Sequence, residues 1–293
     1  MMPLLNRVLT SVPVFPGKAR LAETLGGLGA RWGDGLAVAQ PASGVRLEVD
    51  LRDRIQRQMW GACFEPHVRA CIEALLGPGE VFLDVGANIG YHAAIAAQLV
   101  GPRGTVHAFE ADGELHRRLE HNLAAFPWAT AHACAVWDVS GSLVFERSPD
   151  PTESGWGTLA AVWDRGTGER STVRATSLDD WMDAAHPPAV RMIKIDAEGA
   201  EMAILRGATR LLKRFSPALI LEANDILLRR AGTSAADIAA HLAAAGYRNW
   251  LLERRQLAHW DANARDTFAD VLAVPHARVD ETLAALRHAG WKA

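Results

Sequence analysis

The chain has 293 residues, which is enough for one large α/β domain or for one domain with a small appendage. Its net charge of -3 and its pI of about 6.4 provide no basic surface for nucleic acid or for an anionic membrane. The three cysteines form no Cys-x-x-Cys pair, so we expect neither a zinc site nor a disulfide framework, and we expect a cytoplasmic protein.

The N-terminal segment contains apolar pieces that are too short to cross a membrane. Arg7, Pro13 and Pro16 interrupt them before a signal-peptide core or a span of roughly 20 residues can form. We therefore expect no stable membrane insertion. The sequence leaves the oligomeric state open, a homodimer included.

Residues 1–76 are predicted to form an N-terminal helical and β-hairpin extension. Residues 1–30 predict two short helices, and residues 35–50 alternate around a Pro-Ala-Ser-Gly turn that is typical of a hairpin. Residues 54–76 predict a helix that is broken at a glycine and at a proline.

Residues 77–293 are predicted to form the main domain. From Val81 onward strands and helices alternate, which is the pattern of a parallel sheet with helices on both faces. Core strands are predicted at 81–85, 105–110, 129–136, 190–195 and 218–221, and a hairpin-like pair at 249–253 and 268–274 closes the sheet. The prediction is thus a seven-stranded, mostly parallel sheet.

A long loop is predicted between two short strands of this domain. Residues 142–146 and 171–175 favour a β-ribbon, and residues 147–170 between them are rich in Gly, Pro and Ser and carry Trp156 and Trp163. Long loops inside compact domains are usually functional or disordered. The two tryptophans favour a substrate-side flap.

The stretch from Val81 to Gly90 reads as a buried strand, a glycine turn and the start of a helix. Val81 to Val85 is short and apolar, as in a strand covered on both faces. Gly86 and Gly90 allow a close approach of the backbone to a ligand, and the helix that follows offers unpaired N–H groups. This arrangement is typical of a cofactor-binding turn.

The spacing of the turn indicates which cofactor binds. A dinucleotide fingerprint requires G-x-G-x-x-G, but position 88 is Asn. Asp84 precedes the turn, and Glu110 ends the next predicted strand, about 20 residues further on, where a Rossmann-type sheet places the acid that accepts both ribose hydroxyls. Two acids and no pyrophosphate turn favour a phosphate-free nucleoside such as S-adenosylmethionine.

Further acids fall at the tips of the later strands. Ligands of open α/β sheets bind beyond the carboxyl ends of the strands, so Asp196, Glu198 and Glu222 are expected beside Asp84 and Glu110. An alcohol must lose its proton as it attacks a methyl group, and a carboxylate can accept that proton. We therefore take Asp196, Glu198 and Glu222 as the catalytic candidates.

Two alternatives remain open for these acids. Carboxylates in a first helical turn interact favourably with the helix dipole, and Glu201 could reach back as a cap. Asp196, Glu222 and Asn224 also offer the oxygen ligands that Mg²⁺ prefers, so they are the predicted ligands if a metal binds. Three histidines, which are more often structural than catalytic, are further candidates for the base: His67, His92 and His107.

Five sequence blocks occur in an order that resembles a known family. VFLDVGANIGYH, HAFEA, AVWDVSG, MIKIDAEGAEMAILRGA and LILEAN resemble the FkbM family of S-adenosylmethionine-dependent methyltransferases. They run from about residue 64 to residue 224. The resemblance implies a Rossmann-like class I methyltransferase fold and O-methylation of a hydroxyl on a small natural product, sugar or glycan. Residues 1–50 and 147–170 and the C-terminal quarter carry none of these motifs, and we expect them to select the acceptor.

The resemblance also implies roles for single residues. Asp84, Gly86, Asn88, Gly90 and Glu110 match cofactor positions of the family, and Asp196, Glu198 and Glu201 match its acidic block. The full set from which we expect cofactor contacts is Glu65, Asp84, Gly86, Ala87, Asn88, Gly90, Glu110, Ala135 and Asp196.

The sequence bears on three rival functions. An amino-methylating nucleic-acid enzyme would carry an (Asn/Asp)-Pro-Pro-aromatic turn where this chain has Asp196-Ala-Glu-Gly. The glycine spacing argues against a nicotinamide dehydrogenase. The alternative from another class is a non-catalytic cofactor-binding or interaction module of the same fold.

Overall fold

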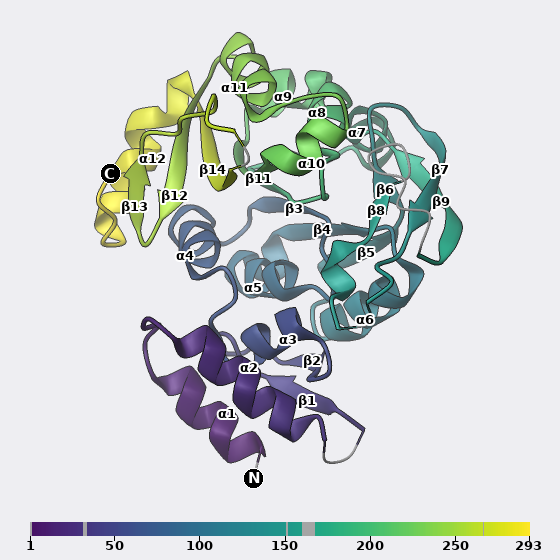
Figure 1. Cartoon of the computed structure of the whole chain (residues 1–293). Coiled ribbons are helices and arrows are strands. Elements are labelled where there is room, and N and C mark those ends of the chain that lie inside the picture. Colours follow the sequence, from purple (N-terminus) through teal and green to yellow (C-terminus); the bar gives the residue numbers. More distant parts are fainter. Residues whose placement is uncertain (1, 32–33, 151, 160–167, 266) are drawn as a thin grey trace.

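A large mixed sheet forms the centre of the molecule (Figure 1). The computed structural model describes the chain except residues 1, 32–33, 151, 160–167 and 266. The strand order across the sheet is β13-β12-β14-β11-β10-β3-β4-β5. The bounds are β3 (Val81–Val85), β4 (Thr105–Glu110), β5 (Ala129–Ala133), β10 (Met192–Ile195), β11 (Ala218–Asn224), β12 (Tyr247–Glu253), β13 (Gln256–Ala258) and β14 (Phe268–Pro275).

The five strands β11, β10, β3, β4 and β5 are parallel, and β14 and β12 add antiparallel neighbours at one side. The predicted Rossmann-like class is confirmed, but the predicted count of seven strands is wrong because the sheet has eight. The additional strand is β13, which folds back on β12 through Arg254 and Arg255. Both residues have positive φ, so the chain makes a two-residue hairpin turn without glycine.

Alternate residues of the central strands enter two separate cores. Phe82 packs in one core with residues of α5 (Tyr91–Val100) and α4 (Pro66–Leu75). Val81 and Leu83 pack in the other, with residues of α8 (Glu201–Arg206) and α11 (Ala235–Ala244). Because successive side chains of a strand point to opposite faces, the sheet is covered on both sides.

A smaller four-stranded sheet lies beside the large one. It has the order β6-β9-β7-β8 and consists of β6 (Ala135–Val136), β7 (Gly141–Glu146), β8 (Thr158–Leu159) and β9 (Arg170–Thr176). The β7 and β9 pair confirms the predicted ribbon. The single strand predicted at 129–136 is wrong: it divides at Cys134, because β5 pairs with β4 while β6 pairs with β9 of the small sheet.

The sequence predicts a single helix from Gly199 to Phe215 after β10, but this helix is also divided. It forms α8 and then α9 (Thr209–Phe215), with Gly207 between them. A Cβ at Gly207 would lie 2.3 Å from the carbonyl oxygen of Trp137, so the backbone is packed against another segment at the break. The helix Asp225–Arg230 (α10) was not predicted from the sequence.

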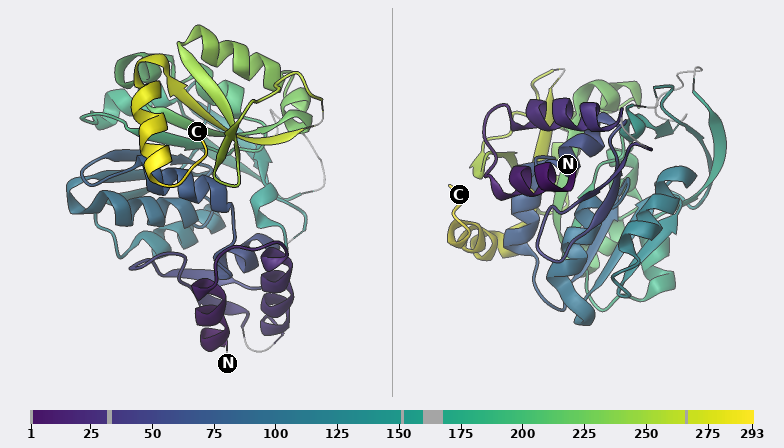
Figure 2. Two further views of the ribbon diagram at one scale, coloured as in Figure 1. Left: turned by 90° about the vertical axis from the view of Figure 1, so that its left-hand side faces the viewer. Right: turned by 90° about the horizontal axis from the view of Figure 1, so that it is seen from below.

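The N-terminal elements stand to one side of the sheet (Figure 2). They are α1 (Met2–Ser11), α2 (Lys18–Gly29), β1 (Leu36–Ala39), β2 (Leu47–Asp50) and α3 (Arg54–Trp60). The hairpin of β1 and β2 and the break between α3 and α4 confirm the predictions for this region. The hairpin is joined to α6 (Gly113–Leu123) by the hydrogen bond of 2.8 Å that the Glu48 N–H donates to Asn122 Oδ1.

Among the helices of the described residues, none has both the length and the apolar character that crossing a membrane requires.

Candidate functional site

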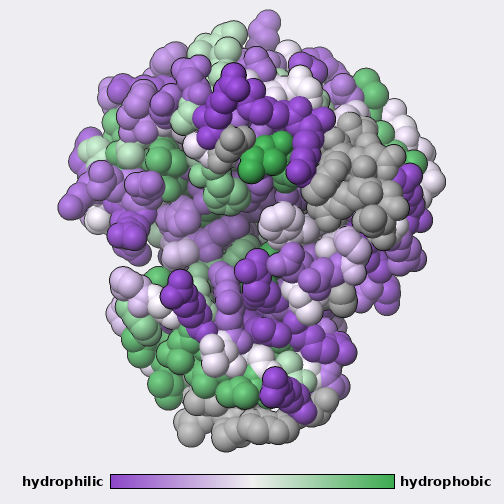
Figure 3. Space-filling view, in the orientation of Figure 1, coloured by the Kyte–Doolittle hydropathy of each residue, from purple (hydrophilic) through white to green (hydrophobic). Residues whose placement is uncertain are grey.

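A pocket of about 330 Å³ opens at the carboxyl ends of the parallel strands, which is a typical size for a small-molecule site. Its lining comes from the tips of β3, β4, β10 and β11, from α3, and from residues 154–159 of the predicted flap. The space-filling view shows the surface hollowed between the N-terminal elements and the rest of the molecule (Figure 3).

The glycine turn after β3 is held against the chain that follows β10. Gly86 has a φ of 76°, and a Cβ at this position would lie 1.8 Å from the carbonyl oxygen of Asp196. The Gly86 and Ala87 N–H groups both donate to the Phe109 carbonyl at 3.0 Å. Gly90, with a φ of 89°, caps the N-terminus of α5. Glycine is therefore required at position 86 because of this contact with protein backbone, whereas the predicted close approach to a ligand stays a prediction.

Glu110 lies at the tip of β4, beside this turn. It is 7 % exposed, and one oxygen accepts from the Asn88 N–H and the other from the Asp112 N–H, each at 2.8 Å. Each carboxylate oxygen has a second lone pair, so two ligand hydroxyls can still bind. Burial raises the pKa of Glu110 to about 7, against the opposing effect of these backbone donors.

Asp84 lies at the tip of β3 and is 1 % exposed. Its carboxylate has no hydrogen bond of ordinary geometry, only a weak interaction with the Ala93 N–H. Burial raises the pKa of Asp84 to about 6, and Lys194 acts in the opposite direction. A buried carboxylate without partners fits an ammonium group such as that of a methionine tail.

A buried lysine sits among the acids of the pocket. Lys194 Nζ donates a hydrogen bond to Asp196 Oδ2 at 2.7 Å. In the register of β10 and β3, Lys194 lies opposite Asp84. Burial alone would lower the pKa of Lys194, but Asp196, Glu65 and Asp84 together raise it. Lys194 is therefore a fixed positive charge in the pocket. This role was not predicted from the sequence, although the position of a lysine between apolar residues in Met-Ile-Lys-Ile indicates a buried charge.

Three of the predicted acids converge. Carboxylate oxygens of Glu65, Asp196 and Glu222 lie within 4.8 Å of one another. Burial raises the pKa of Glu222, and its acidic neighbours Asp196 and Glu198 raise it further. Asn224 also lines the pocket, but its Oδ1 caps α10 by accepting from the Leu227 N–H at 3.4 Å. The side-chain oxygen of Asn224 is therefore already used by the backbone of α10, whereas the carboxylates of Glu65, Asp196 and Glu222 converge.

Glu198 of the Asp-Ala-Glu-Gly block and Glu201, which follows the block, behave differently. Glu198 lines the pocket and has a φ of 50°. Glu201 is 1 % exposed, and its Oε1 accepts from the Ala197 N–H at 3.0 Å and from the Gly199 N–H at 3.2 Å. The reach-back cap considered for Glu201 is present, so this residue shapes the loop and lies outside the pocket lining.

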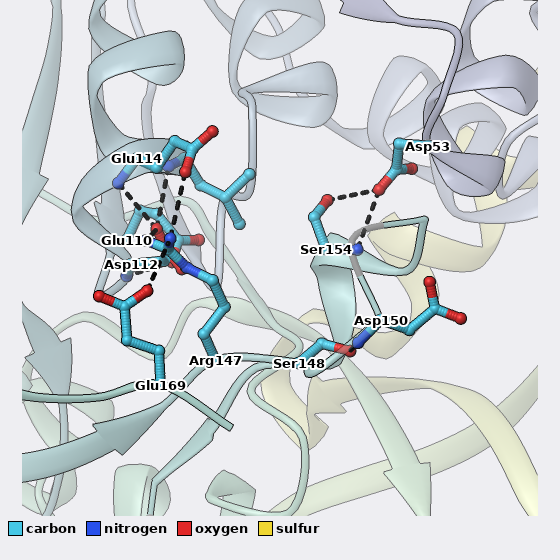
Figure 4. Close-up of polar contacts among 10 residues, drawn as sticks. Asp53, Glu110, Asp112, Glu114, Arg147, Ser148, Asp150, Ser154 and Glu169 are labelled. Carbon is cyan, nitrogen blue, oxygen red and sulfur yellow. Dashed lines mark hydrogen bonds and ion pairs between the residues drawn. The ribbon is translucent and has the colours of Figure 1, made fainter. Parts of the chain in front are cut away.

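The start of the predicted flap is fixed close to Glu110 (Figure 4). Arg147 donates to both oxygens of Asp112, at 2.6 and 2.8 Å, and pairs with Glu114 at 3.1 Å. Asp112 also caps α6 and is buried. This bidentate ion pair anchors the chain next to Glu110.

A second contact fixes the flap to the N-terminal elements. Asp53 Oδ2 accepts from the Ser154 N–H at 2.9 Å and from Ser154 Oγ at 2.6 Å (Figure 4). Asp53 Oδ1 caps α3 by accepting from the Gln56 N–H. Ile55 and Met59 of α3 line the pocket as a result. The contact between Asp53 and Ser154 was not predicted from the sequence. Trp163, the second tryptophan of the predicted flap, lies outside the described residues.

The histidine candidates are not brought together. Only His92 of the three lines the pocket. It is 3 % exposed, and its Nε2 lies 3.7 Å from Glu65 Oε2. Burial lowers the pKa of His92, with Lys194 acting in the same direction, so the ring is neutral. His67 contacts Asp270, and His107 contacts His132.

Comparisons with known proteins find methyltransferases. A relative that is 30 % identical over 135 residues is the hexuronic acid methyltransferase AglP of Haloferax volcanii; the match covers 46 % of this chain and 52 % of AglP. Another is the 2-O-methyltransferase NoeI of Sinorhizobium fredii, which is 27 % identical over 50 % of this chain and 64 % of NoeI. The chain thus spans between half and two thirds of the length of these two relatives.

A crystal structure of an FkbM methyltransferase from Methylobacillus flagellatus is similar over 75 % of this chain and 54 % of that one, with 17 % identity and a TM-score of 0.43. The family model described as the methyltransferase FkbM domain matches residues 84–249, which is more than half of the chain and includes Asp84, Glu110 and Asp196. The chain therefore belongs to the FkbM methyltransferase family.

Proposed function

We propose that this protein transfers a methyl group from S-adenosylmethionine to a hydroxyl of a small natural product, sugar or glycan. The observation that carries the proposal is the pair of buried carboxylates, Asp84 and Glu110, at the tips of the neighbouring strands β3 and β4, with the glycine turn between them. The names of the two relatives support a sugar hydroxyl as the acceptor.

In this proposal, the described residues would provide a partner for the ribose, the amino-acid tail and the adenine of the cofactor. Glu110 would accept the ribose hydroxyls, and Asp84 with Glu65 would receive the ammonium group of the amino-acid tail. Ala135 lines the same pocket and would contact the adenine. The remaining contacts are proposed from Gly86, Ala87, Asn88, Gly90 and Asp196. When bound, S-adenosylmethionine supplies a methyl group activated by its sulfonium charge.

We propose Glu222 as the group that accepts the proton of the acceptor hydroxyl. Its raised pKa makes it a stronger base than an ordinary carboxylate, provided that it is ionised. Asp196 is neutralised by Lys194 at 2.7 Å and is better suited to orient the hydroxyl, as is Glu198. As the new carbon–oxygen bond forms and the carbon–sulfur bond breaks, the hydroxyl proton passes to Glu222.

Glu65, Asp196 and Glu222 are also a ligand set that Mg²⁺ would accept. Lys194 already compensates the charge of Asp196, so we propose that the protein works without the ion. We further propose that residues 77–293 form the methyltransferase domain and that residues 1–76 are an extension that completes the pocket through α3.

Two measurements test the proposal. Isothermal titration with S-adenosylhomocysteine and, separately, with NAD distinguishes the proposed cofactor from a nicotinamide cofactor; we expect binding of the first alone. Incubation with labelled S-adenosylmethionine and a panel of hydroxylated sugars and polyketides then distinguishes an enzyme from a non-catalytic module. Binding of S-adenosylhomocysteine without labelling of any acceptor would favour the module.

A further inference from the structure

We infer that Trp156 and Phe268 form an aromatic platform for an uncharged pyranose ring, and that the pocket disfavours acceptors that carry a carboxylate. This inference rests on the proposed function and specifies its acceptor. The platform is defined by these two residues, which are the large aromatic side chains of the pocket lining that remain exposed, at 38 % and 62 %. The other aromatic side chains of the described lining are buried or partly buried.

Phe268 stands on the same face of the sheet as the proposed base. It is the first residue of β14 and pairs directly with Asn224 of β11, while Glu222 lies two residues earlier on β11. Paired residues of neighbouring strands share a face, and so do residues two apart on one strand. A ring that packs against Phe268 therefore lies next to the carboxylate of Glu222.

Trp156 belongs to a short turn that is held by the N-terminal elements. The turn Ser154–Trp156 is fixed by Asp53, and a Cβ at Gly155 would lie 2.9 Å from Ile55 Cδ1. The Arg54 N–H also donates to the Thr152 carbonyl at 2.9 Å. Trp156 is thus held at the pocket by a packed segment. Covering its exposed ring with the apolar surface of a ligand would lower the free energy of the complex.

The chemistry of a pyranose matches this combination. Its ring faces carry C–H groups that can cover an aromatic ring, and its rim carries hydroxyls that donate to carboxylates and amides. Glu198, Glu222 and Asn224 all line the pocket near the strand tips. Apolar surface and a few polar groups in one pocket favour a ligand that has both kinds of surface.

The charge of the lining argues against an acidic acceptor. Among its described residues, Lys194 is the only lysine or arginine, and it is already paired with Asp196. The acids of the lining are Glu65, Asp84, Glu110, Asp196, Glu198 and Glu222. On the acceptor side, a carboxylate would lie beside Glu198 and Glu222 in a partly desolvated site, while the charge of Lys194 is already compensated by Asp196. The pocket therefore differs from what a hexuronic acid acceptor, such as that in the name of AglP, would require.

The test uses pairs of acceptors that differ in one group: methyl hexopyranosides and the matching methyl hexuronosides, with a phenol series for comparison. Binding is measured by ligand-observed NMR with and without S-adenosylhomocysteine, and transfer is measured with labelled S-adenosylmethionine. We expect a neutral pyranoside to be bound and methylated, with kcat/KM at least about tenfold above that of its uronoside.

Variants test the platform itself. Trp156→Ala and Phe268→Ala should each raise KM for the pyranoside about tenfold while leaving the affinity for S-adenosylhomocysteine and the unfolding midpoint unchanged. Trp156→Phe should retain most of the activity. The matched control is Phe15→Ala, because Phe15 is 42 % exposed and lies outside the pocket lining.

Three results would overturn the inference: preference for the uronoside, no binding of any pyranoside under either condition, or platform variants with an unchanged KM. These results are separable from failure of the proposed function. A protein that binds S-adenosylhomocysteine and methylates only phenols would keep the proposed function and lose the platform, whereas a protein that binds pyranosides but not S-adenosylhomocysteine would lose the proposed function.

Discussion

Gly86 and Asp196 are in such close contact that a methyl group at the first would lie 1.8 Å from the carbonyl oxygen of the second. The glycine turn after β3 and the acidic loop after β10 are therefore positioned by one another. This contact joins the proposed cofactor cradle to the proposed acceptor side of the pocket, so a change in one is expected to displace the other.

Gly86→Ala tests this contact. The added methyl cannot be accommodated without moving backbone, and the φ of 76° is unfavourable for alanine, so we expect a loss of roughly 3 kcal/mol in the free energy of unfolding. Cofactor binding and turnover should fall together. The control is Gly113→Ala at the start of α6, where no atom lies within 4 Å of an added Cβ. If the Gly86 variant keeps normal binding and turnover, the two loops are not coupled as proposed.

The pH dependence of turnover tests the role of Glu222. A base must be ionised, so turnover should rise with pH through the pKa of Glu222, which burial and neighbouring acids place above its usual value of 4.5. Glu222→Gln should reduce kcat by about 100-fold or more and remove this rise. The affinity for S-adenosylhomocysteine should change little in the same variant.

The companion variant is Asp196→Asn, which keeps the size of the side chain. We expect turnover to fall much more than cofactor affinity, because the variant loses the charge that pairs with Lys194 next to the acceptor but keeps a side chain of the same size at the cofactor. Retained turnover would reduce Asp196 to a structural partner of Lys194.

Glu201→Gln tests a structural role with a defined pH signature. Its Oε1 would still accept from Ala197 and Gly199, and an amide would replace the buried Oε2 that has no partner. Burial raises the pKa of Glu201 to about 7 from an unfolded value of 4.5, so the folded state binds more protons and the wild-type protein loses stability as pH rises between these values.

We therefore expect Glu201→Gln to match the wild-type protein below pH 4.5 and to exceed its stability by roughly 3 kcal/mol above pH 8, with turnover retained. Thermal unfolding across this pH range measures the effect. Glu201→Ala is the contrasting variant, since it removes the acceptor of both N–H groups and should lower turnover. A Gln variant with lost turnover would instead place Glu201 in the chemistry.

Removal of divalent cations tests the metal-free mechanism. Because Lys194 compensates Asp196, we expect turnover in EDTA to stay within about twofold of that with added Mg²⁺. Loss of activity in EDTA, with recovery on adding the ion, would assign Glu65, Asp196 and Glu222 to a metal site instead.

The central strands were predictable because buried parallel strands are continuous apolar runs in the sequence. Polar residues near the ends of these runs mark the tips of the strands. Asp84, Glu110, Asp196 and Glu222 were located in this way, and all four line one pocket. The glycine spacing from Gly86 to Gly90 predicted a turn without the dinucleotide pattern. The structure shows in addition that only glycine fits the contact of residue 86 with Asp196.

Features that depend on distant segments were not predictable. Asp53 and Ser154 are 101 residues apart, and each is compatible with an ordinary helix cap or turn when read locally. The helix break at Gly207 lies against the carbonyl of Trp137, which is distant in sequence. The ion pair of Asp196 and Lys194 depends on the direction of a lysine side chain on a buried strand, which the sequence does not specify. The eighth strand was missed because two arginines, rather than glycines, form its hairpin turn.

The central claim is that Glu110 binds the ribose of S-adenosylmethionine. Its carboxylate is held by the Asn88 and Asp112 N–H groups with lone pairs left for two hydroxyls. Glu110→Ala should weaken binding of S-adenosylhomocysteine about 100-fold, since charge-assisted hydrogen bonds are lost, whereas Glu114→Ala on the neighbouring helix should not.

The most direct measurement is a crystal structure with S-adenosylhomocysteine. The account predicts both ribose hydroxyls within about 3 Å of the Glu110 carboxylate and the ammonium group beside Asp84. A pocket that stays empty in the crystal, or a ribose that lies away from Glu110, would contradict it.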